Sequence, residues 1–322
     1  MANVSTPYLV TGASGCIGAW VVKLLLERGD RPVSFDITDD ARRVEQILPL
    51  DRWADVGREK GDITELDAVE RALDRTGARH IIHLAGLQVP FCKSDPMAGA
   101  KVNVLGTVNV FEAAIRHGIE RVAYASSAAV YGPEQDRVDE AAPCRPTTHY
   151  GVYKCANEGS ARIYFQDDGL TTIGLRPLTV YGVGRDQGLT SDLTKAMKAA
   201  VVERPFTVRF SGSTDVIHAR DVAAAFIEAA DRAPSGAHVF NLHGASETIR
   251  TVVDMIHEHA AKPVIEIEGD PLPIPPDMVA DSIESVLPGL PRTPLAEGVA
   301  ETMAQFRTLQ SEGRLTTMEL GA

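Results

Sequence analysis

The chain has 322 residues, 44% of them hydrophobic and 24% charged, and its formal net charge is −12. These values are ordinary for a globular protein and allow one large α/β domain or two lobes with ample core. The acidic balance argues against nucleic acid and anionic membranes as partners, because both need a basic face. The opening residues lack the basic and apolar segments of a signal or membrane anchor, so we expect a cytoplasmic protein.

The first apolar run, 8–11, stops at a turn that contains Gly12, Gly15 and Gly18, and a helical pattern follows over 17–28. This order of strand, tight turn and helix is typical of a dinucleotide-binding site. The glycines let the backbone approach a pyrophosphate, and the helix N-terminus offers it free N–H groups. The sequence therefore predicts cofactor contacts from Gly12, Gly15, Cys16, Ile17 and Gly18.

A second short strand, 32–35, ends in Asp36, roughly 20 residues after the glycines. An acid at this place can accept hydrogen bonds from both hydroxyls of the adenosine ribose. It would repel a 2′-phosphate, and the following Ile37 supplies no cation, so the pattern favours NAD over NADP. The alternative is that Asp36 only begins a turn.

Strand and helix patterns continue to alternate along the first half of the chain. Helical patterns cover 65–76, about 96–117 and 150–168, and strand patterns cover 80–86, 121–125 and 171–175. The alternation predicts an α/β fold with a doubly wound parallel (Rossmann) sheet. Two strand ends add expected cofactor contacts, namely Asp62 and Ile63 beside the adenine, and Leu84, Ala85 and Gly86 where the backbone passes close to the ligand.

The pattern changes at residue 176. Residues 1–175 form the predicted Rossmann domain, 214–245 return to it, and 176–213 together with 246–322 form a smaller lobe that binds substrate. In these later parts we expect helices at 189–202, 221–230, 249–260 and 295–309, and strands at 206–210, 238–241 and 264–267.

Tyr150 and Lys154 lie one helical turn apart, so their side chains share a helix face. A tyrosine has a pKa of about 10, and a neighbouring ammonium favours its phenolate, which would let Tyr150 act as a base. Ser127 follows a strand that ends at the same place and could hold the substrate oxygen. A surface pair and a strand-end cap are the plainer alternatives, but the conjunction with the glycine turn and Asp36 favours a redox site.

These residues resemble the extended short-chain dehydrogenase/reductase family, in its NAD-dependent epimerase/dehydratase group. The resemblance spans nearly the whole chain and rests on 11–18, with Cys16 where an aromatic is usual, and on 83–86, 126–132, 150–154, 175–177 and 215–223. It implies that Ser127, Tyr150 and Lys154 are catalytic and that Lys154 also binds the nicotinamide ribose. It further implies that Asn103 lies beside the cofactor and that homodimers form through helices 96–117 and 150–168.

The sequence departs from the family where dehydratases and decarboxylases carry their acids. Ala128 and Ala129 stand where sugar-nucleotide dehydratases have an acid pair, and decarboxylases keep a glutamate at the position of Ala129. Alanine cannot transfer a proton, so both reactions are disfavoured.

A second departure concerns the diphosphate contacts of nucleotide-sugar 4-epimerases. Thr179 and Thr214 are the nearest counterparts of an Asn and an Arg in those enzymes. Arg185 or Arg209 could substitute, although a solvated surface arginine is the favoured interpretation of each. The departures favour a smaller substrate without a nucleotide, for which Gln88, Ser127, Thr179 and Arg185 are the predicted contacts.

Three functions remain open at this point. The first is an NAD-dependent dehydrogenase acting on a secondary hydroxyl or lactol of a sugar-like polyhydroxy compound. The second is an NAD-dependent nucleotide-sugar 4-epimerase, and the third is a non-catalytic protein that senses the dinucleotide. The four cysteines show no metal-ligand spacing, so we expect reduced thiols and no metal site.

Overall fold

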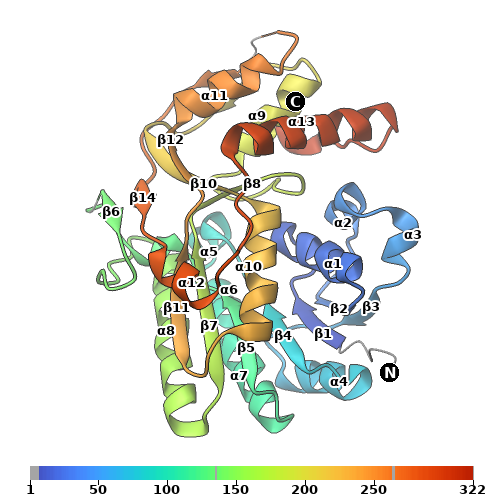
Figure 1. Cartoon of the computed structure of the whole chain (residues 1–322), viewed down its shortest axis with the longest axis vertical. Coiled ribbons are helices and arrows are strands. Elements are labelled where there is room, and N and C mark those ends of the chain that lie inside the picture. Colours follow the sequence, from blue (N-terminus) through green and yellow to red (C-terminus); the bar gives the residue numbers. More distant parts are fainter. Residues whose placement is uncertain (1–6, 135, 263–264, 322) are drawn as a thin grey trace.

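The computed structural model describes residues 7–134, 136–262 and 265–321. Its centre is a seven-stranded parallel sheet in the order β11-β7-β5-β4-β1-β2-β3 (Figure 1). The strands are β1 (Pro7–Thr11), β2 (Arg31–Asp36), β3 (Gly57–Lys60), β4 (His80–His83), β5 (Arg121–Ala125), β7 (Thr171–Pro177) and β11 (Ala237–Leu242). This confirms the predicted doubly wound sheet. Strand order reverses on either side of β1, and ligands in such sheets bind at that crevice.

Helices cover both faces of the sheet because alternate residues of its strands point to opposite sides. Val10 belongs to one core with α1 (Cys16–Arg28) and α10 (Ala219–Arg232). Leu9 belongs to the other core, which α4 (Leu66–Thr76) and α7 (Gly106–Arg116) complete. Helix α8 (His149–Asp168) packs beside α7 on that second face.

The helix expected at 96–117 is not regular throughout. It consists of α6 (Pro96–Ala100), a π-helical segment over Lys101–Leu105, and α7. The carbonyl of Asn103 accepts hydrogen bonds from the Thr107 hydroxyl at 2.7 Å and from the Asn157 amide at 2.9 Å. π-Helical turns often accompany functional sites, and this one carries Asn103 towards the strand ends.

The C-terminal part adds a three-stranded sheet in the order β12-β10-β8. Within 214–245, α10 and β11 join the central layers, whereas β10 pairs with β8 and β12 of this smaller sheet. The division into two lobes at the predicted boundaries stays a prediction. The strands of this part are β8 (Thr179–Tyr181), β9 (Phe206–Val208), β10 (Ser213–His218), β12 (Ala245–Thr248), β13 (Ile265–Ile267) and β14 (Asp277–Met278), which pairs with β6 (Arg137–Val138).

The remaining helices are α2 (Arg42–Ile47), α3 (Leu50–Trp53), α5 (Val89–Ser94), α9 (Asp192–Val201), α11 (Ile249–Glu258), α12 (Asp281–Val286) and α13 (Leu295–Ser311). Helices α9, α11 and α13 gather at the end of the molecule where the C-terminus lies (Figure 1). Val264, in the predicted strand 264–267, falls outside the described residues. Among the described residues, every helix is too short or too polar to cross a membrane.

Candidate active site

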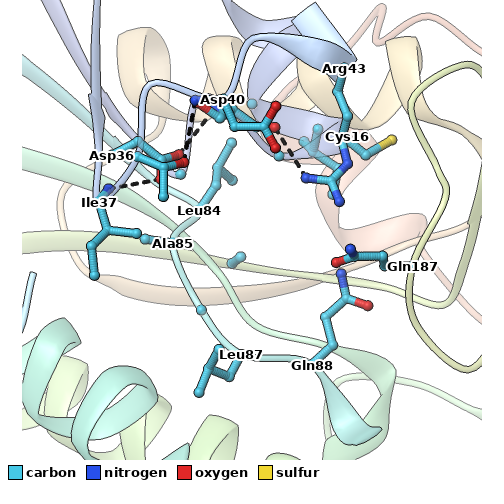
Figure 2. Close-up of a pocket in the computed structure, with 18 of the residues that line it drawn as sticks. Cys16, Asp36, Ile37, Asp40, Arg43, Leu84, Ala85, Leu87, Gln88 and Gln187 are labelled. Carbon is cyan, nitrogen blue, oxygen red and sulfur yellow. Dashed lines mark hydrogen bonds between the residues drawn. The ribbon is translucent and has the colours of Figure 1, made fainter. Parts of the chain in front are cut away.

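A cavity of about 420 Å³ opens at the carboxyl ends of β1, β2, β3 and β4. The predicted cofactor residues that follow these strands all line it (Figure 2). They are Gly12, Gly15, Cys16, Ile17, Gly18, Asp36, Asp62, Ile63, Leu84, Ala85 and Gly86. The N-terminus of α1 opens into this cavity without an acidic residue in its first turn, which suits a bound pyrophosphate.

The glycine turn is tight enough that two of its glycines admit no side chain. Gly12 has φ +70°, and a Cβ there would lie 2.7 Å from the backbone nitrogen of Ala85. A Cβ on Gly18 would lie 2.3 Å from the carbonyl oxygen of Gly12. The turn and the end of β4 are therefore in close contact, and this contact shapes the cavity wall.

The carboxylate of Asp36 is held in place at the end of β2. It accepts hydrogen bonds from the backbone N–H of Ser14 at 3.1 Å and of Ile37 at 2.8 Å (Figure 2). A carboxylate offers about four lone-pair sites, so capacity remains for two ribose hydroxyls. The residues present therefore fit the adenosine end of a dinucleotide.

The same wall carries side chains that sequence patterns did not indicate. Arg43 points into the cavity, and its guanidinium pairs with Asp186 at 2.8 Å and donates to the Ser14 carbonyl at 3.3 Å (Figure 2). Arg43 and Asp36 thus both contact the backbone of Ser14, and the same cavity contains a cation that Ile37 does not supply. Gln187 also lines the cavity from the segment after β8. No local motif marks these positions, because they meet only in the folded chain.

A second cavity of about 200 Å³ adjoins the first and shares Gly86, Gln88 and Arg185 with it. Ser127, Tyr150 and Lys154 line this second cavity. The structure therefore brings the three predicted catalytic residues together beside the cofactor cavity. It also places two of the predicted substrate residues, Gln88 and Arg185, at the junction of the cavities.

Tyr150 lies in the first turn of α8, which Thr148 caps by accepting a hydrogen bond from the Gly151 N–H at 3.1 Å. Burial raises the pKa of Tyr150, while the Ser127 side chain and the charge of Arg185 act to lower it. The sequence predicted that Lys154 would supply the lowering charge. In the structure, the charge of Arg185 acts to lower the pKa of the Tyr150 phenol, and both side chains line the second cavity.

Lys154 is only 4% exposed. Its ammonium donates to the carbonyl of Ala125 at 2.6 Å and lies 5.5 Å from the centroid of the Tyr150 ring. Burial lowers the pKa of Lys154 to about 8. The residue therefore ties α8 to the end of β5 and brings a cation within reach of the predicted base.

Asn103 lies behind the cofactor cavity rather than on its wall. Its amide nitrogen donates to the Leu87 carbonyl at 3.1 Å, and a Cβ on Gly86 would lie 2.7 Å from its amide oxygen. His83 joins Thr11 at 2.7 Å and Thr107 at 3.0 Å, and burial lowers its pKa to about 3. The buried side chains of Asn103 and His83 therefore hold the ends of β1 and β4 and the segment after β4 in position.

The structure corrects two predictions about substrate contacts. The Thr179 side chain is fully buried, its hydroxyl pairs with that of Thr214 at 2.8 Å, and it lines neither cavity. Arg185 is half-buried at the junction of the cavities, so the favoured interpretation of a solvated surface residue was wrong for it. Arg209 is 70% exposed and pairs with Asp192 at 2.7 Å, as expected for a surface arginine.

One group of three side chains in the described residues has metal-ligand chemistry, namely Asp215, His243 and Asp277. His243 forms an ion pair with Asp215, which raises the pKa of the imidazole, and Arg137 pairs with Asp277 at 3.3 Å. His243 and Arg137 are thus side-chain partners of the two carboxylates. The cluster therefore acts as a structural ion-pair network between β10, β14 and β6.

Comparison with known proteins agrees with this geometry. A model of the NAD-dependent epimerase/dehydratase family matches residues 8–242. The chain is 29% identical over 318 residues to UDP-glucose 4-epimerase of Azospirillum brasilense, covering 91% of this chain and 90% of that protein. It is 31% identical over 255 residues to uncharacterized protein y4nG of Sinorhizobium fredii, where it spans 78% of this chain and 60% of the relative.

The fold is also similar to that of a solved epimerase. The crystal structure of Thermus thermophilus UDP-glucose 4-epimerase in complex with NAD superposes with a TM-score of 0.81 at 28% identity, covering 94% of this chain and 99% of that one. The family model spans most of the chain, and the cavity at the switch point has the residues that the cofactor requires. The protein therefore belongs to the NAD-dependent epimerase/dehydratase family of extended short-chain dehydrogenases/reductases, and it is an enzyme with NAD as its cofactor.

Proposed function

We propose that this enzyme oxidises a secondary hydroxyl or lactol of a small, sugar-like polyhydroxy compound. The observation that carries the proposal is the closed pair formed by Thr179 and Thr214. These are the counterparts of the diphosphate contacts in nucleotide-sugar 4-epimerases, and here they are 0% and 1% exposed and bonded to each other. Neither hydroxyl is available to a diphosphate.

The size of the second cavity supports the same conclusion. Its volume is about 200 Å³, whereas sites for drug-sized ligands are roughly 300–1,000 Å³. A free polyhydroxy compound of few carbons suits this space better than a nucleotide sugar.

The roles of the residues follow from their positions. Tyr150 takes the proton from the reacting hydroxyl, Ser127 holds that oxygen, and Lys154 keeps a positive charge near the phenolate. Bound NAD would accept the hydride from the same carbon. The nearby alanines, Ala128 and Ala129, offer no second acid or base, so the chemistry stops at oxidation or reduction.

A nucleotide-sugar 4-epimerase is the second candidate. It is favoured by the similarity to UDP-glucose 4-epimerases along nearly the whole chain. Such an enzyme would use the same three residues to oxidise and then reduce one carbon, without net production of NADH.

A panel of substrates separates the two functions. Purified enzyme and NAD are mixed with free polyhydroxy compounds or with UDP- and dTDP-sugars, and NADH absorbance and product epimers are measured. Steady NADH formation from a free compound supports the dehydrogenase. Conversion of a nucleotide sugar to its epimer without net NADH overturns it and establishes the epimerase.

The proposal includes a cytoplasmic homodimer formed through α7, α8 and their neighbours. Leu105, Val152 and Ile163 are 44%, 49% and 46% exposed on α8 and on the π-helical segment before α7, and a second copy of the chain would cover them. Light scattering of the purified protein tests the dimer, and a monomeric mass would contradict it.

A further inference from the structure

We propose that the substrate carries a carboxylate and that Arg185 binds it beside Tyr150. This inference rests on the proposed dehydrogenase function and narrows its substrate to a polyhydroxy acid. It depends on the charge of the second cavity, on the surroundings of Arg185, and on the side chain of Gln88 at the junction of the two cavities.

The second cavity is cationic although the chain is acidic. Its lining in the described residues contains Lys154 and Arg185 but no aspartate or glutamate, in a chain of net charge −12. The ammonium of Lys154 is already bonded to the Ala125 carbonyl at 2.6 Å. Arg185 is therefore the cation available to a ligand.

The guanidinium of Arg185 has few partners in the described residues. One terminal nitrogen donates to the Thr190 hydroxyl at 3.2 Å, while the buried Nε makes no hydrogen bond. No carboxylate there pairs with it, since the adjacent Asp186 is engaged by Arg43 at 2.8 Å. Burial lowers the pKa of Arg185, although the nearby charge of Asp186 acts to raise it. A ligand anion would supply the missing charge and acceptors.

The backbone of Gly188 packs closely against the side chains of Gln88 and Arg185. Its φ is +100°, and a Cβ there would lie 2.1 Å from the Gln88 amide oxygen and 3.0 Å from a terminal nitrogen of Arg185. The Gln88 amide oxygen is also buried without a hydrogen-bond partner in the described residues. An acceptor beside a forked donor matches a hydroxyl next to a carboxylate, which is the pattern of a hydroxy acid.

A carboxylate fits better than a phosphate in this position. A single guanidinium presents two parallel donors that match one planar monoanion. A phosphoryl group would add volume and charge to a cavity of about 200 Å³ that has one free cation among its described lining residues. The acid group would lie in the same small cavity as the reacting carbon, since Arg185 and Tyr150 both line it.

The test compares matched substrates and variants of the whole enzyme with NAD. Aldonic and uronic acids are assayed against the corresponding alditols and methyl esters, and against sugar phosphates. The acids are expected to exceed their neutral counterparts in kcat/KM by at least about 10-fold, as for a charge-assisted hydrogen bond. A preference for sugar phosphates, or for the neutral compounds, overturns the carboxylate while leaving the dehydrogenase in place.

Arg185→Met is expected to raise KM for the acid by about 10- to 100-fold more than KM for the neutral alditol. Because Arg185 also lowers the pKa of Tyr150, the two substrates are expected to share any loss in kcat. Arg185→Lys should fall between, because lysine keeps the charge without the fork. Arg71→Met, an exposed arginine on α4, is the matched control and should leave both values unchanged.

The affinity of wild type and variant for NAD must also be compared, because Arg185 lines the cofactor cavity as well as the substrate cavity. It is measured by titration of wild type and Arg185→Met, which also shows that the variant is folded. A shift of less than about threefold is expected. If the Kd for NAD rises as much as the KM for the acid, Arg185 binds the cofactor and the inference is wrong. Epimerisation of a nucleotide sugar without NADH would remove the proposed function and this inference together.

Discussion

The two adjoining cavities differ in how the chain builds them. The cofactor cavity takes most of its wall from the ends of β1 to β4, within the first 90 residues, and the cofactor residues predicted there follow strands in short motifs. The substrate cavity draws on 125–129, 147–154, 177–190 and 273–274, which come from different elements. A wall made of strand ends can be predicted from local patterns, whereas a wall made of converging side chains depends on the tertiary fold.

The largest expected effect is on the substrate side of this comparison. Tyr150→Phe should lower kcat by about 10²- to 10⁴-fold, because general base catalysis contributes about that much, while NAD binding is retained. Steady-state kinetics and an NAD titration measure the two quantities. Tyr153→Phe is the control, since that hydroxyl only donates to the Pro96 carbonyl at 2.7 Å. Undiminished turnover by Tyr150→Phe would contradict the role of the phenol.

Lys154 should give a pH dependence of stability, because it is held with a pKa of about 8 against a usual value of 10.5. Between these values the unfolded chain binds more protons than the folded one, so stability rises with pH. The free energy of unfolding of the wild type should therefore gain up to ~3 kcal/mol over this window relative to Lys154→Met. Denaturant melts at several pH values measure it.

The exposed Lys60 provides the control for that experiment, and Lys60→Met should follow the wild type at every pH. A constant difference between wild type and Lys154→Met across the window would show that Lys154 does not titrate there.

A smaller effect is expected on the cofactor side. Asp36→Ala should weaken NAD binding by about 10- to 100-fold and reduce the preference for NAD over NADP, because hydrogen bonds from two ribose hydroxyls to a charged group are lost. Asp40→Ala removes an acid from the same cavity that is already paired with Arg42 at 2.6 Å, and it should have little effect. Equal losses in both variants would rule out a specific ribose contact.

The smallest expected effect is on stability, and it concerns the hydrogen bond between the Thr179 and Thr214 hydroxyls. Thr179→Val or Thr214→Val alone should cost about 1 kcal/mol of stability, because one buried hydroxyl loses its partner, and the double variant should cost less than the sum. Thermal melts and substrate kinetics are measured together. A change in substrate KM in either single variant would mean that the pair contacts substrate after all.

The sequence predicted the lining of the cofactor cavity and the grouping of Ser127, Tyr150 and Lys154 more fully than it predicted the rest of the substrate cavity. The close backbone contacts at Gly12 and Gly18 could be predicted because only glycine fits them. Asp36 could be predicted because it is the last residue of its strand. Arg43 and Gln187 were missed, since Arg43 comes from the short helix α2 and Gln187 from the irregular segment after β8, and neither position carries a motif. Thr179 was assigned to the substrate by its place in the chain, but its hydroxyl turns to Thr214 inside the smaller sheet.

By itself, the sequence determined the parallel α/β fold, and it predicted the residues that line the cavity at the strand ends and the acid proposed to bind the ribose. These features depend on periodicity, on glycine conformations and on strand ends, which are local properties of the chain. Only the tertiary structure decided which arginine is buried at the junction of the cavities, which threonines close on each other, and how burial sets the pKa values of Tyr150 and Lys154. Burial and pKa values depend on which segments, far apart in the chain, exclude water from a side chain, and no local sequence pattern encodes those contacts.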